Sequence, residues 1–87
     1  MAYEVVYDKE AVRFLDKLTL DDRQRIVKKI KEAKVNPFSY FEKLTSINAY
    51  KLIVGDYRVI ADIDKTEIKI LVVKIGHRKN IYKRLGI

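Results

Sequence analysis

The sequence predicts one α+β domain, residues 1–87, in which two N-terminal helices cover one face of a sheet made of later strands. Apolar residues recur with helical spacing over 11–33, and they alternate as in strands over 47–75. Two short turns, Gly55-Asp56 and Asp64-Lys65-Thr66, divide the strand-like region. With 87 residues and 48% apolar residues, the chain is long enough to bury a single core.

The N-terminal part of the chain predicts a short strand followed by a helix hairpin. Residues 2–7 are β-prone and alternate in polarity. Asp8 is placed to cap a first helix that extends to about Leu18, and Thr19 is placed to cap a second. The second helix ends before Pro37, because the residue before proline avoids helical dihedrals. Since almost no chain separates the two helices, we expect them to pack antiparallel.

The rest of the chain predicts three strands and a final short helix. The strands are expected at 47–54, 57–64 and 67–75. Residues 38–46 are too apolar for a free loop, and they indicate a turn of helix packed on the sheet edge. Asn80 and Gly86 are placed to cap and to stop the short helix between them.

Alternation along the strands predicts which face of the sheet is buried. The face toward the helices is apolar throughout: Tyr50, Leu52, Val54, Tyr57, Val59, Ala61, Ile63, Leu71, Val73 and Ile75. The opposite face is expected to carry cations above an apolar floor. The cations are Lys51, Arg58, Lys74 and, if the alternation continues, Arg78, and the floor is Ile53, Ile60, Ile70 and Val72. Such a surface suits a nucleotide chain, whose phosphates meet cations and whose bases meet the floor. A face that is basic only for solubility is the alternative, but it does not explain the apolar floor.

Positive charge is concentrated toward the C-terminus of a chain whose formal net charge is +7. No acid follows Glu67, whereas the cations continue with Lys69, Lys74, Arg78, Lys79, Lys83 and Arg84. This asymmetry predicts an end that faces a polyanion, although a lysine-rich solvated surface has the same composition. The basic outer face of the second helix has the same two interpretations. The absence of cysteine excludes thiol chemistry and disulfides, and no run is apolar enough to span a membrane. We therefore expect a cytoplasmic protein.

Two single residues allow two interpretations each. His77, the only histidine, falls on the core side by alternation, and proton transfer would require it to turn outward. No second histidine or carboxylate stands near it at ligand spacing, so no metal site is expected. Tyr82 lies on a different side of the last helix from Ile81 and Leu85. It either packs or faces the sheet end toward Arg78.

Three segments resemble the RelE/ParE toxin superfamily, in particular its RelE-like branch. They are Ala49-Tyr50-Lys51-Leu52, Val54-Gly55-Asp56-Tyr57-Arg58-Val59-Ile60 and Gly76-His77-Arg78-Lys79-Asn80-Ile81-Tyr82. The resemblance covers essentially the whole chain and implies a curved, mainly antiparallel sheet backed by the helix hairpin. It also implies a toxin of a type II toxin–antitoxin system that cuts mRNA on the ribosome. Cleavage would proceed by attack of the RNA 2′-OH, without metal or cofactor, and a cognate antitoxin would neutralise the toxin.

The resemblance also implies roles for individual residues. Lys51, Arg58 and Arg78 would be the catalytic cations and Tyr82 the aromatic base, while the remaining candidates for RNA phosphate binding are Lys74, His77, Lys79, Lys83 and Arg84. One position departs from the members that have two lysines in the first of the three strands, because Ile53 stands where the second lysine would be. This departure predicts weak or lost cleavage unless Lys74 compensates. The alternatives are a non-cleaving relative and a ParE-like toxin that inhibits DNA gyrase by binding it.

Overall fold

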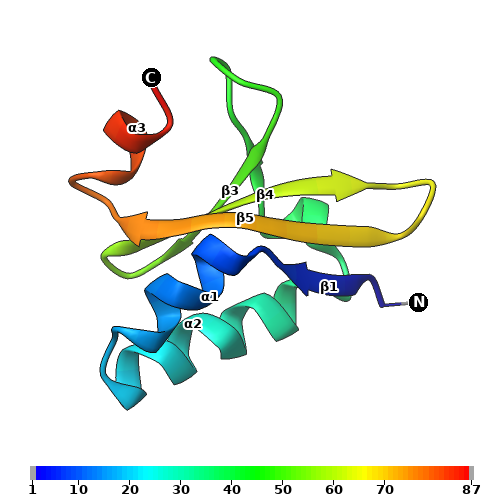
Figure 1. The fold of residues 1–87 in the computed structure, drawn as a ribbon. Helices are drawn as coiled ribbons and strands as arrows, with labels where there is room; N and C mark the ends of the chain where they lie inside the picture. Colours follow the sequence, from blue (N-terminus) through cyan, green and yellow to red (C-terminus); the bar gives the residue numbers. More distant parts are fainter. Residues whose placement is uncertain (1, 87) are drawn as a thin grey trace.

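A computed structural model of the protein describes residues 2–86 and contains one five-stranded sheet with the strand order β1-β5-β4-β3-β2. The elements are β1 (Glu4–Tyr7), α1 (Lys9–Asp16), α2 (Leu20–Ala33), a 3₁₀ turn (Pro37–Ser39), β2 (Glu42–Lys43), β3 (Tyr50–Val54), β4 (Tyr57–Asp64), β5 (Lys69–His77) and α3 (Ile81–Arg84). β1 pairs with β5 in parallel, and the other neighbours are antiparallel. Helices α1 and α2 lie on one side of the sheet and α3 on the other (Figure 1). The α+β class predicted from the sequence is confirmed.

The two predicted helix caps are present. The Asp8 carboxylate accepts a hydrogen bond from the Glu10 amide at 3.0 Å, and the Thr19 hydroxyl accepts one from the Asp22 amide at 3.3 Å. Helix α1 ends two residues earlier than the expected Leu18. The Arg23 guanidinium of α2 donates to Leu15 O in the last turn of α1 at 3.0 Å, and to Leu18 O in the connection between the helices at 3.3 Å. Arg23 therefore links the two helices, a role that the sequence did not indicate.

The main core lies between the helix hairpin and the sheet. Of the residues predicted there, Leu15, Ile26, Ile30, Leu52, Val59 and Ala61 are buried, and Phe14, Leu18, Val27 and Tyr50 are partly buried against them. Lys51 and Arg58 do not join this core. The face assignment is therefore correct for β3 and β4.

The face assignment fails in β5, where a bulge changes the alternation. Ile60 pairs with Lys74, but the next residue, Ala61, pairs with Val72, so Val73 is the extra residue. As a result Ile70 and Val72 are fully buried in the main core, whereas Leu71 and Val73 are only partly buried. The prediction that Leu71 and Val73 face the helices and that Ile70 and Val72 belong to the opposite floor is wrong. Counting by twos along a strand cannot detect an inserted residue.

Two connections also differ from their predictions. The turn of helix expected in residues 38–46 is present only at their start, as the 3₁₀ turn Pro37–Ser39, in which Phe38 packs edge-on against Tyr50 at 5.6 Å. Glu42–Lys43 instead add a short edge strand. The turn between β4 and β5 is longer than expected and delays β5 to Lys69. The Asp64 carboxylate accepts hydrogen bonds from two amides of this turn, and Ile68 has a positive φ of 54°.

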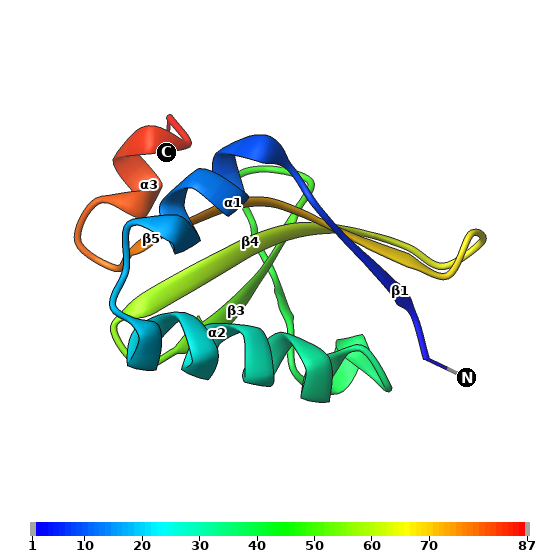
Figure 2. The same ribbon diagram turned by 60° about the horizontal axis from the view of Figure 1, so that its bottom comes forward.

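A second, smaller apolar cluster covers the other face of the sheet. It consists of Leu44, Ala49, Ile60 and Ile81, with Ile47, Val73, Tyr82 and Leu85 packed against it. Helix α3 thus lies over the sheet face that the sequence left uncovered, close to α1 at the same end of the molecule (Figure 2). Gly86, with φ of 77°, stops the helix as predicted, but Asn80 makes no side-chain cap. No helix within residues 2–86 is long and apolar enough to cross a membrane.

Candidate functional site

Two cations flank an apolar residue in one row across the outer face of the sheet. Lys51 of β3 pairs with Ile60 of β4, and Ile60 pairs in turn with Lys74 of β5. Directly paired residues of antiparallel strands share a face, so these three side chains leave the sheet on the same side. Ile60 is buried as a member of the second cluster, and the exposed part of the predicted floor is Ile53, which is 44% exposed. The floor is therefore smaller than expected.

The next row holds Ile53, Arg58 and Gly76. A Cβ atom on Gly76 would lie 2.8 Å from Ile81 Cδ1, so the glycine leaves the space in which Ile81 of α3 rests on the sheet. Ile81 in turn fixes the position of its neighbour Tyr82. Both ends of the segment from Gly76 to Tyr82 thus contribute to packing: Gly76 makes room for Ile81, and Tyr82 packs against the second cluster.

Tyr82 and Lys51 come together at this end of the sheet. The Lys51 ammonium lies 6.0 Å from the centre of the Tyr82 ring, at the outer limit of a cation–π contact. Lys51 also lies 3.8 Å from the carboxylate of Glu42 in the short edge strand. A phenol and a cation are therefore adjacent on the outer face, as the prediction for these two residues requires.

Arg58 and Arg78 meet at the β3–β4 turn. The Arg58 guanidinium donates to the carbonyls of Gly55 and Tyr57 at 3.0 and 2.9 Å. The Arg78 guanidinium lies 3.5 Å from the Asp56 carboxylate, and the Arg78 amide donates to Asp56 O at 2.7 Å. Both arginines thus contact the Gly55-Asp56 turn, and Arg78 lies at the end of the sheet rather than above its centre.

Glu10 of α1 joins two of the predicted phosphate-binding cations. Its Oε1 atom lies 3.0 Å from Arg84 Nη2 and 3.4 Å from Lys74 Nζ. These contacts connect α1, β5 and α3. Lys74 and Arg84 are therefore brought together by an acid that the sequence did not single out.

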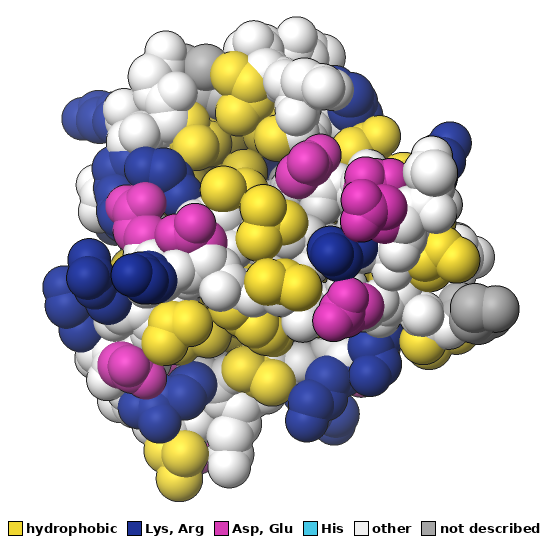
Figure 3. Space-filling view, turned by 45° about the vertical axis from the view of Figure 1, so that its right-hand side comes forward, with side chains coloured by type: hydrophobic (Ala, Val, Ile, Leu, Met, Phe, Trp, Pro, Cys, Tyr) yellow, Lys and Arg dark blue, Asp and Glu magenta, His cyan; other side chains and the backbone are white. Residues whose placement is uncertain are grey.

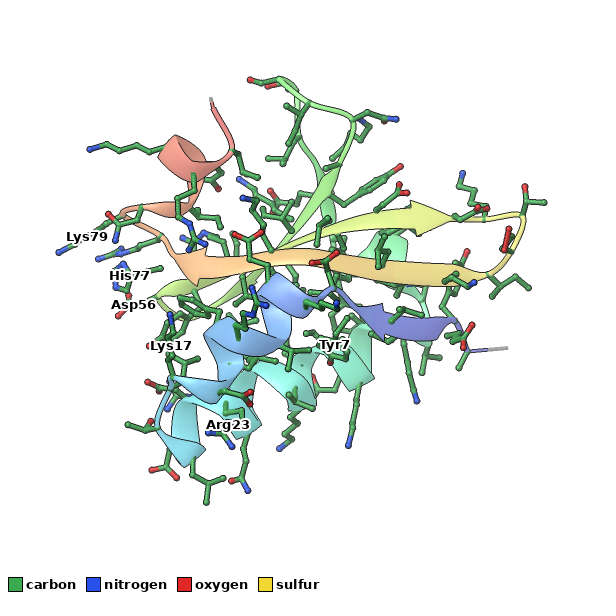
Figure 4. The ribbon with its side chains drawn as sticks, viewed as in Figure 1. Tyr7, Lys17, Arg23, Asp56, His77 and Lys79 are labelled. Atoms are coloured by element: carbon green, nitrogen blue, oxygen red, sulfur yellow. The ribbon has the colours of Figure 1, made fainter. Side chains whose placement is uncertain are left out.

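His77 lies away from these cations, on the helix side of the sheet as alternation predicted. It pairs with Tyr57, and the two rings are in edge contact at 5.9 Å. The Tyr57 hydroxyl donates to Asp22 at 3.0 Å, and burial, followed by this hydrogen bond, raises the pKa of Tyr57 above its usual value. His77 Nδ1 accepts a hydrogen bond from the Lys79 amide at 3.2 Å. His77, Lys79 and Asp56 lie at the same end of the sheet (Figure 4).

The remaining cations of the tail, Lys79 and Lys83, are exposed. Elsewhere acids and bases are interleaved: Figure 3 shows a hydrophobic band with both charges beside it, and Lys69 lies 4.0 Å from Glu4 and 3.7 Å from Glu67. Lys79 and Lys83 thus add exposed positive charge at the end of the molecule that carries α3.

This arrangement is suited to holding a phosphate chain. The ion pairs of Lys51, Lys74 and Arg78 are at least partly exposed, so each contributes little to stability and can be exchanged for a phosphate. Within residues 2–86 no three His, Asp or Glu side chains are grouped to hold a metal ion. The sequence did not single out the acids Glu10, Glu42 and Asp56, because each approaches its cation only through the fold. The separations along the chain range from 9 residues for Glu42–Lys51 to 74 for Glu10–Arg84.

Comparison with known proteins identifies the family of this chain. The family described as "ParE toxin of type II toxin-antitoxin system, parDE" matches residues 5–82. The chain belongs to the RelE/ParE toxin superfamily. No curated protein matches its sequence.

Solved structures of the superfamily share the fold. The RelBE2 toxin–antitoxin complex of Mycobacterium tuberculosis contains a chain with 21% identity and a TM-score of 0.82, and the match covers 90% of this protein and 100% of that chain. The RelBE complex of E. coli gives 23% identity and a TM-score of 0.75, covering 87% and 96%. The RelB–RelE complex of Methanococcus jannaschii gives 25% identity and a TM-score of 0.69, covering 88% and 94%. The protein is thus a toxin of a type II toxin–antitoxin system with the fold seen in RelE structures.

Proposed function

We propose that this toxin cleaves mRNA on the ribosome by transesterification. The observation that carries the proposal is the grouping of Lys51, Arg58 and Tyr82 on the outer face of the sheet, beside α3, with Arg78 at its end. The predicted roles of these four residues require that grouping. RNA would contact this face through its phosphates.

The chemistry needs charge neutralisation and two proton transfers. The RNA 2′-OH attacks the adjacent phosphorus, the bond to the 5′-oxygen breaks, and the products are a 2′,3′-cyclic phosphate and a 5′-hydroxyl. Tyr82, as the phenolate, would take the proton from the 2′-OH, and Arg58 and Arg78 would bind the phosphorane oxygens through their planar guanidinium groups. The leaving 5′-oxygen would take its proton from a water molecule, and Tyr82 would then return the 2′-OH proton to the resulting hydroxide. Lys51 would add positive charge beside Tyr82. In the free toxin both arginines bind the Gly55-Asp56 turn, so they must turn toward the RNA.

Primer extension on programmed ribosomes tests this proposal directly. Purified toxin, ribosomes and a defined mRNA should give new 5′ ends at fixed positions within codons, and removing divalent metal from the toxin should not prevent them. Intact mRNA at toxin concentrations that stop translation would contradict cleavage. If the wild type cleaves weakly and Ile53→Lys cleaves faster, the isoleucine at this position, where other members have a lysine, accounts for the weak activity.

A second candidate function is inhibition of DNA gyrase. It is favoured by the family description, which names a ParE toxin rather than RelE. A supercoiling assay with purified gyrase distinguishes the two functions: inhibition of supercoiling together with intact mRNA would favour the ParE-like activity.

The partner proposed for this chain is a cognate antitoxin. Several of the solved relatives are toxin–antitoxin complexes, among them the RelB–RelE pairs of E. coli and M. jannaschii. We expect the product of the adjacent open reading frame to co-purify with this protein and to relieve growth arrest when both are expressed. An amphipathic helix or an added strand would suit the outer face or a neighbouring edge.

A further inference from the structure

A basic groove lies between α1 and α3, outside the grouping of Lys51, Arg58 and Tyr82. Its volume is about 440 Å³, and it is lined by Glu10, Arg13, Phe14, Lys17 and Arg84. Glu10, Arg13 and Phe14 of α1 and its C-cap residue Lys17 have the spacing i, i+3, i+4, i+7 and so form one stripe along that helix. In Figure 4, Lys17 marks the α1 end of this region, on the same edge of the molecule as His77 and Lys79.

The cations of the groove outnumber its acids. Arg84 is bound to Glu10 at 3.0 Å, and the same carboxylate oxygen also lies 3.4 Å from Lys74. Neither Arg13 nor Lys17 has an ion-pair partner within residues 2–86. One acid therefore faces four cations, Arg13, Lys17, Lys74 and Arg84, which come from three different elements.

The lining favours a nucleic-acid backbone over a protein segment. An amphipathic helix would need a row of apolar contacts, and the groove offers only Phe14. Phe14 is partly buried and already packs edge-on against Tyr57 at 6.1 Å. Phosphates need little apolar surface but several cations along a track, which is what Arg13, Lys17 and Arg84 provide.

We propose that the groove between α1 and α3 is a second RNA-binding site, in which Glu10 acts as a built-in competitor of phosphate. Arg13 and Lys17 bind phosphates directly, and a further phosphate displaces the Glu10 carboxylate from Arg84 and Lys74. Since Lys74 also lies in the row with Lys51, RNA bound here would continue from the site that we propose for cleavage. This inference rests on the proposed function in one respect, that the RNA bound in the groove is the mRNA to be cleaved.

The test is the binding of a single-stranded RNA oligonucleotide with 2′-O-methyl groups, which cannot be cleaved, at several salt concentrations. The double variant R13Q/K17Q should lower the slope of log affinity against log salt by about 1.4, because each phosphate contact on a single strand contributes about 0.7. The matched control is K28Q/K31Q, which removes the same charge from α2, and its slope should stay close to that of the wild type. Equal losses in the two double variants would overturn the assignment, because they would show only a net-charge effect.

The role of Glu10 has its own test. E10Q should bind the oligonucleotide about two- to fivefold more tightly, as expected when a surface ion pair no longer competes. The control is E32Q, which breaks the Lys29–Glu32 pair, at 3.8 Å on α2, and removes the same charge. An equal gain in E32Q would overturn the competitor role, because it would show only an effect of net charge. Cleavage is measured separately with mRNA and ribosomes. Intact mRNA with groove-dependent binding would refute only the proposed function, and cut mRNA with groove-independent binding would refute only this inference.

Discussion

Arg58 and Arg78 bind the same turn but are held with different strength. Arg58 donates to two backbone carbonyls, whereas Arg78 is 55% exposed and faces one exposed carboxylate at 3.5 Å. Arg78 is thus the easier of the two to release toward RNA. If Arg78 stabilises the phosphorane, Arg78→Ala should slow the cleavage step by about 10²–10³-fold, and Arg78→Lys should rescue poorly because it lacks the planar fork.

Single-turnover cleavage on programmed ribosomes separates this step from binding, which should weaken far less. Asp56→Asn is the matched control, because it releases Arg78 without removing it and should leave cleavage intact. Wild-type cleavage by Arg78→Ala once it is bound would move the catalytic assignment to Tyr82 and Arg58.

The raised pKa of Tyr57 should make the free energy of unfolding depend on pH. Its hydroxyl donates to Asp22, and burial and that hydrogen bond raise its pKa. The folded protein therefore holds this proton more tightly than the unfolded chain, so the contribution is complete below about pH 10 and is lost as pH rises through the folded-state pKa. Tyr57→Phe should cost about 1 kcal/mol at neutral pH through the lost hydrogen bond.

The measurement is urea unfolding of wild type and Tyr57→Phe at neutral and alkaline pH. Both proteins contain the same lysines, so the titration of the lysines cancels in the difference between their free energies of unfolding. The two free energies of unfolding should converge as the pH rises above about 10. A difference that stays constant over this range would show that the phenol proton is not linked to folding.

At the scale of elements, Ile81 is the fully buried side chain of α3. Ile81 is fully buried over Gly76, and Tyr82 follows it in the same turn of helix. Ile81→Ala should cost at the lower end of the roughly 2–5 kcal/mol range for buried aliphatic truncations, because a terminal helix can detach instead of enclosing a cavity. Amide exchange in residues 81–85 should accelerate while that of β4 does not.

Ile81→Val is the control for this prediction and should retain the docked helix at a cost of about 0.5–1.5 kcal/mol. Cleavage by Ile81→Ala should fall because Tyr82 leaves Lys51, although Ile81 itself contacts no reacting atom. Unchanged cleavage in Ile81→Ala would remove Tyr82 from the proposed mechanism.

The sequence predicts elements well where short-range rules decide them. Asp8 and Thr19 cap their helices, and Gly55 takes the positive φ that a tight hairpin requires, because each depends on neighbours in the chain. The bulge at Val73 depends on the register of β5 against β4 and has no local signal. It moved Ile70 and Val72 to the core and halved the expected apolar floor.

In the candidate site too, the features set by neighbours in the chain were predicted, and those set by distant parts of the fold were not. Alternation places Lys51 and Arg58 on the outer face and His77 on the helix side correctly, since the strands that carry them are regular there. The partners of these cations could not be predicted. Glu10, in particular, reaches Lys74 and Arg84 only because α1 crosses beside the end of β5 and close to α3.

At the scale of the whole molecule, both apolar clusters share one sheet and a small stability margin. A domain of 87 residues has about 4–13 kcal/mol of unfolding free energy, at roughly 0.05–0.15 kcal/mol per residue. Leu52, which is 2% exposed, lies in the main core, and Leu52→Ala should remove about 2–5 kcal/mol of this margin. The neighbouring residue of the same strand, Ile53, is 44% exposed and points to the other face.

Ile53→Ala is therefore the matched control and should change stability by about 0.5 kcal/mol or less, as is usual for surface positions. Urea unfolding should show a lower midpoint for Leu52→Ala with an unchanged slope, because the same surface is still exposed in one cooperative step. Since β3, β4 and β5 separate the two clusters, far-UV circular dichroism and the fluorescence of the tyrosines on both faces should follow the same transition. Equal losses in the two variants would contradict the assignment of faces in β3, and separate transitions would show that α3 and its cluster unfold independently of the main core.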